Sequence, residues 1–293
     1  MWQQLTLHAR SEDCEELEDK LLTQGAVSIT YLDAEDQPVF QEEPGSTPMW
    51  DNTVLLALFT EDTDLTFILA ALRNEEKILN REQLTAEPLA DQAWERSWMD
   101  SFQPMRFGNR LWICPSWQSP PEPEAVNLFI DPGLAFGSGT HHTTAMCLTW
   151  LDSADVAGKT LIDYGCGSGV LALAAALLDA KVVHAVDNDP QAILATRDNA
   201  QRNSIAAERI PTYLPAELPD MQADILLANI LAAPLQSLAA TFAQLLKPGG
   251  QLVLSGLLTT QIDDVIAAYQ SWVDFAAPVI DADWVCLTGT RRA

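Results

Sequence analysis

Glycine occupies every second position in the segment GCGSG (residues 165–169), which follows the apolar run TLIDY. Glycine lets the backbone turn tightly and lets a ligand lie against it. A dinucleotide-binding turn has the spacing G-x-G-x-x-G, whereas the third glycine here comes one residue early. This spacing favours S-adenosylmethionine, which has no phosphate, over NAD; a purely structural turn is the alternative. Asp163, Gly165 and Gly167 are therefore candidate cofactor-binding residues.

An acidic residue, Asp187, ends the next apolar run, KVVHAVD, 22 residues after Gly165. A carboxylate at the tip of the second strand of a doubly wound sheet can accept hydrogen bonds from both ribose hydroxyls of an adenosine cofactor. The alternative is a helix cap, since Pro190 begins a helix, but Asp189 is better placed for capping. Together with the glycine turn, Asp187 predicts an adenosine-cofactor site.

Asn229 begins the segment NILA (residues 229–232) at the end of the predicted fourth strand. Ligands in open parallel sheets bind beyond the carboxyl ends of the strands. An amide there can accept a hydrogen bond from an amine and direct its lone pair toward a methyl group. Asn229 is therefore a candidate for both cofactor contact and amine positioning. The alternative is a simple cap for a helix over residues 232–246.

A glycine-rich segment, DPGLAFGSGTH (residues 131–141), precedes a predicted helix. Three glycines around Phe136 favour a mobile lid over the site. Thr140 can cap the helix, and Thr144 lies in its first turn, where free backbone N–H groups can hold a carboxylate; capping alone is the alternative. Phe136 and His141 are candidate catalytic residues, although a loop histidine is more often simply solvated.

The elements that must position these residues follow a regular order. Strand-like and helix-like runs alternate over residues 159–272, which indicates a parallel, doubly wound sheet. Apolar runs near 276–280 and 284–289 predict a closing antiparallel hairpin. The runs RLWIC and VNLFI, within residues 106–130, predict another hairpin around the exposed turn PPEPE. We therefore expect a Rossmann-like, seven-stranded, mostly parallel α/β domain over residues 105–293.

The first part of the chain has a different pattern. Residues 1–90 show the order βαββαβ, with the second helix over 65–78, which is the ferredoxin-like α+β arrangement. By analogy, such a domain commonly serves recognition. Trp94 and Trp98 are four residues apart and share a face if residues 91–104 form a linker helix. A wall of the active site is the alternative for these tryptophans.

The charge of the chain is strongly negative and unevenly distributed. The 293 residues include 16 Lys and Arg against 41 Asp and Glu, a net charge of −25. Residues 1–100 carry 6 basic and 22 acidic side chains, and residues 101–293 carry 10 and 19. Nucleic acids and anionic membrane surfaces call for clustered Lys and Arg, so neither is an expected partner. A basic partner docked on the first hundred residues is favoured, with plain solvation as the alternative.

Three further observations indicate the compartment. The longest apolar run, residues 170–178, is shorter than the roughly 18 residues of a membrane span. The opening MWQQLTLHAR has no basic segment followed by an apolar one. Five cysteines without a CxxC pair fit neither a disulfide framework nor a zinc site. We expect a cytoplasmic, metal-free monomer.

These motifs together resemble one family. DPGLAFGSGTH, DYGCGSG with Asp187, NILA and the upstream segments WERSWMDSFQPMRFG and LWICPSW are similar to the PrmA family of bacterial methyltransferases. That family modifies the eleventh protein of the large ribosomal subunit. The likeness runs through the whole chain. DPGLAFG and NILA are far more specific than the glycine turn, which most methyltransferases of this fold share.

The resemblance implies cofactor contacts from four residues, Thr144, Gly165, Asp187 and Asn229. It also implies that the first domain recognises the ribosomal protein, free or on the ribosome, and that several α- and ε-amino groups become trimethylated. Two residues depart from the family pattern, because Ser138 replaces a threonine in the loop and His142 replaces a proline after the histidine. These departures affect the rigidity of the loop rather than a predicted cofactor contact.

Methyl transfer is an in-line displacement on the sulfonium carbon, for which the protein supplies orientation and charge placement. We predict that Asn229 and nearby backbone carbonyls bind the neutral amine and that solvent removes its proton. One alternative is methylation of another protein's amino or amide nitrogen, although amide methyltransferases of this fold usually carry N-P-P-Y where this chain has NILA. Another is a cofactor-binding ribosome assembly factor without catalysis.

Overall fold

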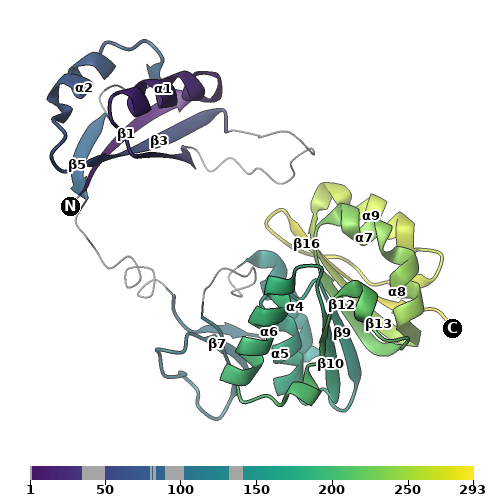
Figure 1. The fold of residues 1–293 in the computed structure, drawn as a ribbon. Helices are drawn as coiled ribbons and strands as arrows, with labels where there is room; N and C mark the ends of the chain where they lie inside the picture. Colours follow the sequence, from purple (N-terminus) through teal and green to yellow (C-terminus); the bar gives the residue numbers. More distant parts are fainter. Residues whose placement is uncertain (1, 35–49, 80, 82–83, 90–101, 132–140) are drawn as a thin grey trace. The chain divides into compact units, whose positions relative to one another are not determined.

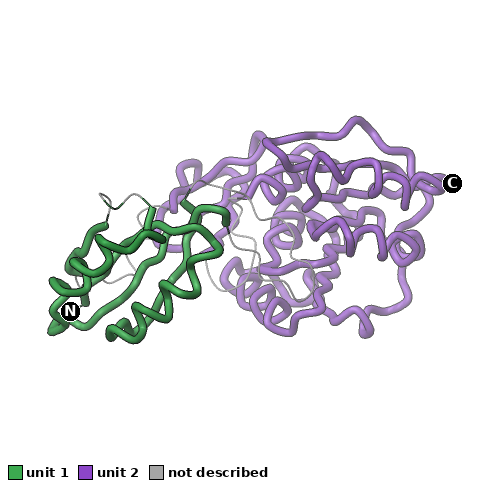
Figure 2. Tube along the Cα trace, turned by 90° about the horizontal axis from the view of Figure 1, so that it is seen from above, with its two compact units in different colours: residues 1–101 green, residues 102–293 purple. Residues whose placement is uncertain are grey.

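The computed structural model describes residues 2–34, 50–79, 81, 84–89, 102–131 and 141–293. The chain divides into two compact units, residues 1–101 and 102–293 (Figure 2), and each has a hydrophobic core of its own. The predicted linker helix falls almost wholly outside the described residues, and the part that is described, residues 102–104, is not helical.

The first unit is an antiparallel sheet with two helices on one face (Figure 1). In chain order its elements are β1 (Trp2–Arg10), α1 (Ser11–Thr23), β2 (Ser28–Asp33), β3 (Asn52–Thr60), α2 (Leu65–Leu72), β4 (Ile78–Leu79) and β5 (Thr85–Leu89). The sheet order is β2-β3-β1-β4, and β5 also pairs with β1. Side chains alternate between the faces of a strand. Leu5, Leu7, Leu55 and Phe59 therefore lie fully buried in one core with Leu17 and Leu21 of α1.

The helix predicted over residues 65–78 is shorter in the structure. It ends at Leu72, and the chain turns so that Ile78 pairs with Ala9 of β1. Ile78 is buried in the core of the unit. Its apolar side chain is thus buried by joining the sheet rather than by extending the helix.

The second unit is built on a mostly parallel sheet of order β11-β10-β9-β12-β13-β16-β14, with β15 also paired to β16. The parallel strands are β9 (Thr160–Tyr164), β10 (Val182–Val186), β11 (Thr212–Tyr213), β12 (Ala223–Asn229) and β13 (Leu246–Leu258). The antiparallel strands are β14 (Val273–Phe275), β15 (Val279–Asp281) and β16 (Trp284–Arg291). The sheet has eight strands rather than the predicted seven. Two short strands, separated by the segment around Pro278, pair with β16, and proline lacks the N–H that a continuous ladder needs.

Helices cover both faces of this sheet (Figure 1). One face carries α4 (His142–Ser153), α5 (Val170–Leu177) and α6 (Pro190–Arg202), and the other carries α7 (Ala232–Ser237), α8 (Ala239–Leu245) and α9 (Ile262–Tyr269). The predicted α/β class with a mostly parallel sheet is therefore confirmed. The single helix predicted over 232–246 is two helices that meet at Leu238.

The hairpin predicted within residues 106–130 is wrong. β6 (Met105–Phe107) and β7 (Leu111–Cys114) are antiparallel, but β7 and β8 (Val126–Phe129) are parallel. Parallel neighbours need a crossover connection. The segment 115–125, which contains PPEPE, therefore carries the chain back to the level where β7 begins instead of reversing it in a tight turn. Among the described residues, no helix is long and apolar enough to cross a membrane.

Candidate functional site

The glycine turn connects β9 to α5. The N–H groups of Gly165 and Cys166 both donate to the carbonyl oxygen of Val186 at the end of β10, at 2.7 and 3.0 Å. Gly165 has φ of +83°, and a Cβ at this position would overlap the side chain of Ile230. Only glycine fits there, because the turn passes directly against the residue that follows Asn229.

Asp187 lies at the end of β10 and is bound to the turn. Its Oδ2 accepts a hydrogen bond from Gly167 N at 2.9 Å, and its Oδ1 accepts one from Asp189 N at 3.0 Å. Asp189 caps α6 by accepting from Gln191 N at 2.8 Å, so capping is not the role of Asp187. Each carboxylate oxygen has a second lone pair, which leaves Asp187 able to accept from hydroxyl groups of a ligand.

Asp163 is buried beneath the turn, with only 1% of its surface exposed. Its Oδ2 accepts from Ala172 N in α5 at 3.0 Å, whereas its Oδ1 has no hydrogen-bond partner among the described residues. Burial raises the pKa of Asp163 to about 7; the backbone hydrogen bond from Ala172 opposes this rise, and the charge of Asp187 adds to it. A buried acceptor without a donor is costly, and a cationic amine would both satisfy it and lower its pKa.

Asn229 lies at the end of β12, opposite Ser255 of β13 in the parallel register. Its side-chain Nδ2 donates to the hydroxyl oxygen of Thr144 at 3.2 Å. Because the nitrogen is held by this threonine, the carbonyl oxygen of the amide is left to accept from another group. The alternative of a helix cap fails, since the N-cap of α7 is Leu231 and no side chain caps that helix.

The first turn of α4 carries Thr144, which is fully buried. The N-cap of α4 is His141, whose Nδ1 accepts from Thr143 N at 3.3 Å and lies 2.8 Å from the Thr143 hydroxyl oxygen. The prediction of Thr140 as cap is therefore wrong, because an imidazole nitrogen fills that position. Thr140, Phe136 and Ser138 lie outside the described residues.

His141 is a poor candidate for a catalytic base. Its ring contacts that of Trp284 edge to face, with centroids 4.8 Å apart, and Nδ1 is engaged by the cap. Burial, and to a lesser degree the neighbouring His142, lower the pKa of His141. The geometry therefore gives His141 a role in holding α4.

Two residues that sequence reasoning missed hold the site together. Ser255, fully buried, has its hydroxyl oxygen 3.2 Å from the carbonyl oxygen of Thr143 and 3.1 Å from that of Val285, so these two acceptors share its single proton. A Cβ on Gly256 would overlap the backbone of Ile230. A serine and a glycine that follow the apolar run QLVL were the available signal, because polar side chains are rare inside buried parallel strands.

The arrangement fits an adenosine cofactor that carries an amino acid. The carboxylate of Asp187 suits ribose hydroxyls, the unpaired Oδ1 of Asp163 suits an ammonium group, and the bare backbone of the turn allows close approach. Asn229 adds an acceptor at the end of the adjoining strand, where a second reactant can meet the cofactor.

Comparison with known proteins gives the family. The family model described as "Ribosomal protein L11 methyltransferase (PrmA)" matches residues 1–292. This chain belongs to that family. The matched range spans both units, so the first unit is as much a part of the L11 methyltransferase pattern as the sheet that carries the site.

Individual members of the PrmA family are similar over the full length. The L11 methyltransferase of Pseudomonas aeruginosa (strain PAO1) is 54% identical, covering 100% of this chain and 99% of its own. That of Pseudomonas savastanoi pv. phaseolicola is 55% identical, covering 99% of both chains. The crystal structure of a ribosomal protein L11 methylase from Lactobacillus delbrueckii subsp. bulgaricus matches with a TM-score of 0.60 and 30% identity, covering 66% of this chain and 100% of that chain.

Proposed function

We propose that this chain is an S-adenosylmethionine-dependent N-methyltransferase whose substrate is ribosomal protein L11. The observation that carries the proposal is the meeting of three strand ends. β9 leads into the glycine turn, β10 ends at Asp187, and β12 ends at Asn229, which is hydrogen-bonded to Thr144. Relatives 54% identical over their full length are named L11 methyltransferases, which supports this substrate.

The chain's own residues give each part of the cofactor a place. Asp187 accepts from the ribose hydroxyls, Asp163 accepts from the α-ammonium group, and Gly165 and Gly167 bring the backbone against the cofactor. The free N–H groups in the first turn of α4, at Thr144, face the carboxylate of the cofactor's amino-acid part. When bound, S-adenosylmethionine supplies a methyl group activated on a sulfonium.

Asn229 holds the attacking amine. Its Nδ2 is fixed by Thr144, so its Oδ1 accepts from the neutral amine and orients the nitrogen lone pair for in-line attack. Because His141 is engaged in capping, solvent takes the proton. An α-amino group, with pKa about 7.7–8.0, loses its proton more readily than a lysine, with pKa about 10.4. Trimethylation of α- and ε-amino groups repeats this deprotonation for each methyl.

The first unit, over residues 1–90, is a ferredoxin-like domain that recognises the substrate, with residues 91–104 as linker and residues 105–293 as the methyltransferase domain. The strand order β2-β3-β1-β5 and the two helices on one face support this assignment. The enzyme acts as a cytoplasmic monomer, in the compartment where its ribosomal substrate is made.

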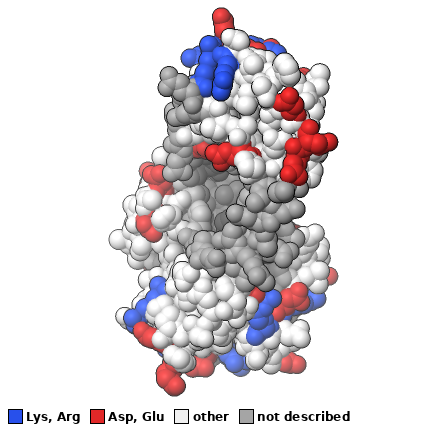
Figure 3. Space-filling model, turned by 90° about the vertical axis from the view of Figure 1, so that its left-hand side faces the viewer, with Lys and Arg blue, Asp and Glu red and all other residues white. Residues whose placement is uncertain are grey.

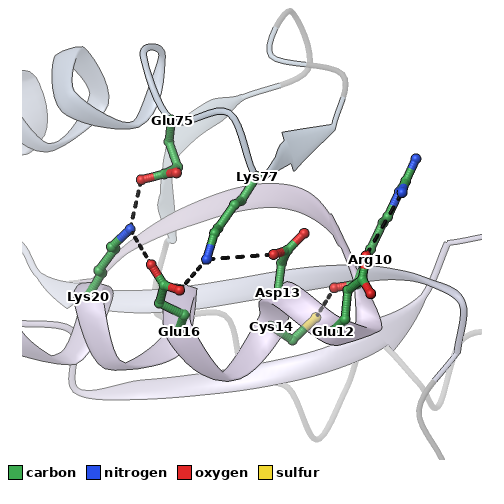
Figure 4. A network of polar contacts seen from close by, with 8 residues as sticks. All are labelled: Arg10, Glu12, Asp13, Cys14, Glu16, Lys20, Glu75 and Lys77. Carbon is green, nitrogen blue, oxygen red and sulfur yellow. Dashed lines mark hydrogen bonds and ion pairs between the residues drawn. The ribbon is translucent and has the colours of Figure 1, made fainter.

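Recognition uses the charge that the first unit leaves uncompensated. Lys20 Nζ of α1 lies 2.9 Å from Glu16 of the same helix and 2.8 Å from Glu75, which follows α2. Lys77, just before β4, pairs with Asp13 and Glu16 of α1 (Figure 4). These ion pairs compensate the acidic side chains on one side of α1. On the face drawn in Figure 3, the main acidic and basic patches lie apart on this unit.

The outer positions of α1 carry free acids. Glu15 and Asp19 are exposed, one helical turn apart on the same face, and neither forms an ion pair with a described residue. A cluster of uncompensated carboxylates attracts a basic protein and raises its rate of encounter. This face is where the basic substrate docks.

Transfer of tritium from labelled S-adenosylmethionine into purified L11 tests the proposal. The full chain is expected to place label on amino groups of L11, and the Asn229→Ala variant to place far less while it still binds the cofactor. Label on an amide nitrogen would favour the amide-methyltransferase alternative. Cofactor binding without any transfer would favour a non-catalytic assembly factor.

A further inference from the structure

An apolar strand edge lies beside the candidate site. β15 pairs with β16 in an antiparallel register from Val279↔Cys286 to Asp281↔Trp284, and among the described residues it has no second neighbour in the sheet. Residues 276–283 are all exposed, with 53% of Val279 and 54% of Ile280 accessible. Open edges that carry apolar side chains can pair with another chain, and proteins usually block them. This one is left open.

The edge adjoins the helix turn that holds Asn229. Asp281 Oδ2 lies 2.8 Å from His142 Nδ1 in the first turn of α4. The same turn carries Thr144, whose hydroxyl accepts from Asn229. A helical turn rises only about 5 Å, and an extended chain advances about 3.3 Å per residue. A peptide on the edge of β15 therefore lies close to the first turn of α4, whose exposed side carries His142 and whose buried side holds Asn229 through Thr144.

The chemistry of the edge suits an extended basic peptide. Backbone N–H and C=O groups pair with any sequence, Val279 and Ile280 offer apolar contact, and the exposed carboxylates of Asp281 and Asp283 favour lysine. Pro278 cannot donate and confines the open edge to a short stretch. Pairing of this kind is brief and tolerant of sequence, which is what an enzyme with more than one target amine requires.

We propose that an extended, lysine-bearing segment of the protein substrate lies along the free edge of β15 while its amine is at Asn229. This proposal rests on the proposed function, because it names how the substrate of that reaction is presented. It adds a second contact surface, in the methyltransferase unit, to the docking expected of the first unit.

The test uses the full chain with the double variant Val279→Ser, Ile280→Ser. The matched control is Leu194→Ser, since Leu194 on α6 is 58% exposed in the same unit. The KM for L11 is expected to rise about tenfold in the double variant, the loss expected when two half-exposed aliphatic side chains no longer bury against a partner. The kcat and the Kd for S-adenosylmethionine should stay within about twofold, because surface substitutions rarely disturb a fold. The control should leave all three constants unchanged.

Hydrogen–deuterium exchange of residues 279–281 provides a second readout that needs no methyl transfer. Addition of L11 is expected to slow exchange at these amides in the wild-type chain, and about tenfold more L11 should be needed for the same effect in the double variant. Unchanged exchange together with an unchanged KM would overturn the proposal and leave the proposed function intact. A wild-type dimer that the double variant dissociates would also overturn it, because a second copy would then occupy the edge. If the wild-type chain failed to methylate L11, the proposed function would be wrong. The exchange result alone would then decide whether L11 lies along the edge of β15.

Discussion

The two units of this chain rely on different kinds of interaction. In the second unit, the site is fixed by hydrogen bonds that backbone N–H groups donate, such as Gly165 N to the Val186 carbonyl oxygen at 2.7 Å and Gly167 N to Oδ2 of Asp187 at 2.9 Å. In the first unit, the prominent polar groups are side chains at the surface, several of them half-buried, and surface ion pairs contribute only about 0–1 kcal/mol each. Methyl transfer at the proposed site depends on geometry that one added methyl group disturbs, whereas the recognition that we propose for the first unit depends on summed charge that tolerates single changes.

The largest effect is expected from Asn229→Ala, which removes the acceptor that orients the amine. We expect kcat for L11 methylation to fall about 10²- to 10³-fold, the usual loss when one preorganised polar contact to a transition state is removed. The Kd for S-adenosylmethionine, measured by calorimetry, should change far less. Comparable losses in both constants would show that Asn229 serves cofactor binding rather than the transition state. Thr144→Ser, which keeps the hydroxyl, is the control and should retain most activity.

Gly165→Ala tests whether geometry governs the second unit. The added Cβ overlaps Ile230 and occupies a left-handed conformation. We expect the free energy of unfolding to fall by about 2–4 kcal/mol and cofactor affinity to drop with it. Gly158→Ala is the matched control, because Gly158 has φ of +69° and open space around its Cβ position. Urea unfolding should show a loss of only about 1–2 kcal/mol for the control, with unchanged affinity. Equal losses of unfolding free energy and of cofactor affinity in the two variants would show that contact with Ile230 is not what requires glycine at position 165.

We expect an effect of moderate size from pH on cofactor binding. The pKa of Asp163 is raised to about 7 in the folded chain from 3.8. Protonated Asp163 therefore contributes to the free energy of unfolding. This contribution is fully present below pH 4 and is lost as the pH rises through about 7. A bound ammonium group favours the ionised carboxylate, so binding must expel the proton at low pH.

The apparent Kd for S-adenosylmethionine is accordingly expected to be about tenfold weaker at pH 6 than at pH 8. Calorimetry in buffers of different ionisation enthalpy should record close to one proton released at pH 6 and almost none at pH 8. Asp163→Asn should abolish this slope, while Asp264→Asn, an exposed acid in α9, should preserve it. A slope that survives in Asp163→Asn would assign the proton to another group.

Features of the fold and the site that depend on neighbouring residues could be predicted from the sequence, whereas those that depend on contacts between distant residues could not. The glycine turn and Asp187 were placed correctly, because a strand, a tight turn and a helix start lie within a few residues of one another. Ser255 was missed, since it acts through Thr143, 112 residues away along the chain. The unpaired oxygen of Asp163 was equally hidden, because burial and not residue type creates it. The parallel pairing of β7 and β8 depends on where the second strand returns, which local turn residues do not determine.

The smallest effect is expected from charge removal on the first unit. The double variant Glu15→Gln, Asp19→Asn should raise the KM for L11 about threefold at low salt, since each exposed charge contributes a few tenths of a kcal/mol, and the difference should vanish at about 1 M salt. The control Asp263→Asn, Asp264→Asn removes the same charge from α9 of the second unit. An equal rise in KM for the control would mean that net charge alone, and not its location, attracts the substrate.

We propose that methyl transfer takes place in the second unit and that the main docking surface for the substrate lies on the first unit. The most direct test is a chain without residues 1–90, assayed in parallel for cofactor affinity and for methyl transfer to L11. We predict a Kd for S-adenosylmethionine within about twofold of the full chain, because the site residues that the structure describes all belong to the second unit, and almost complete loss of L11 methylation. Undiminished methylation by the shortened chain would contradict the proposal that the first unit docks the substrate.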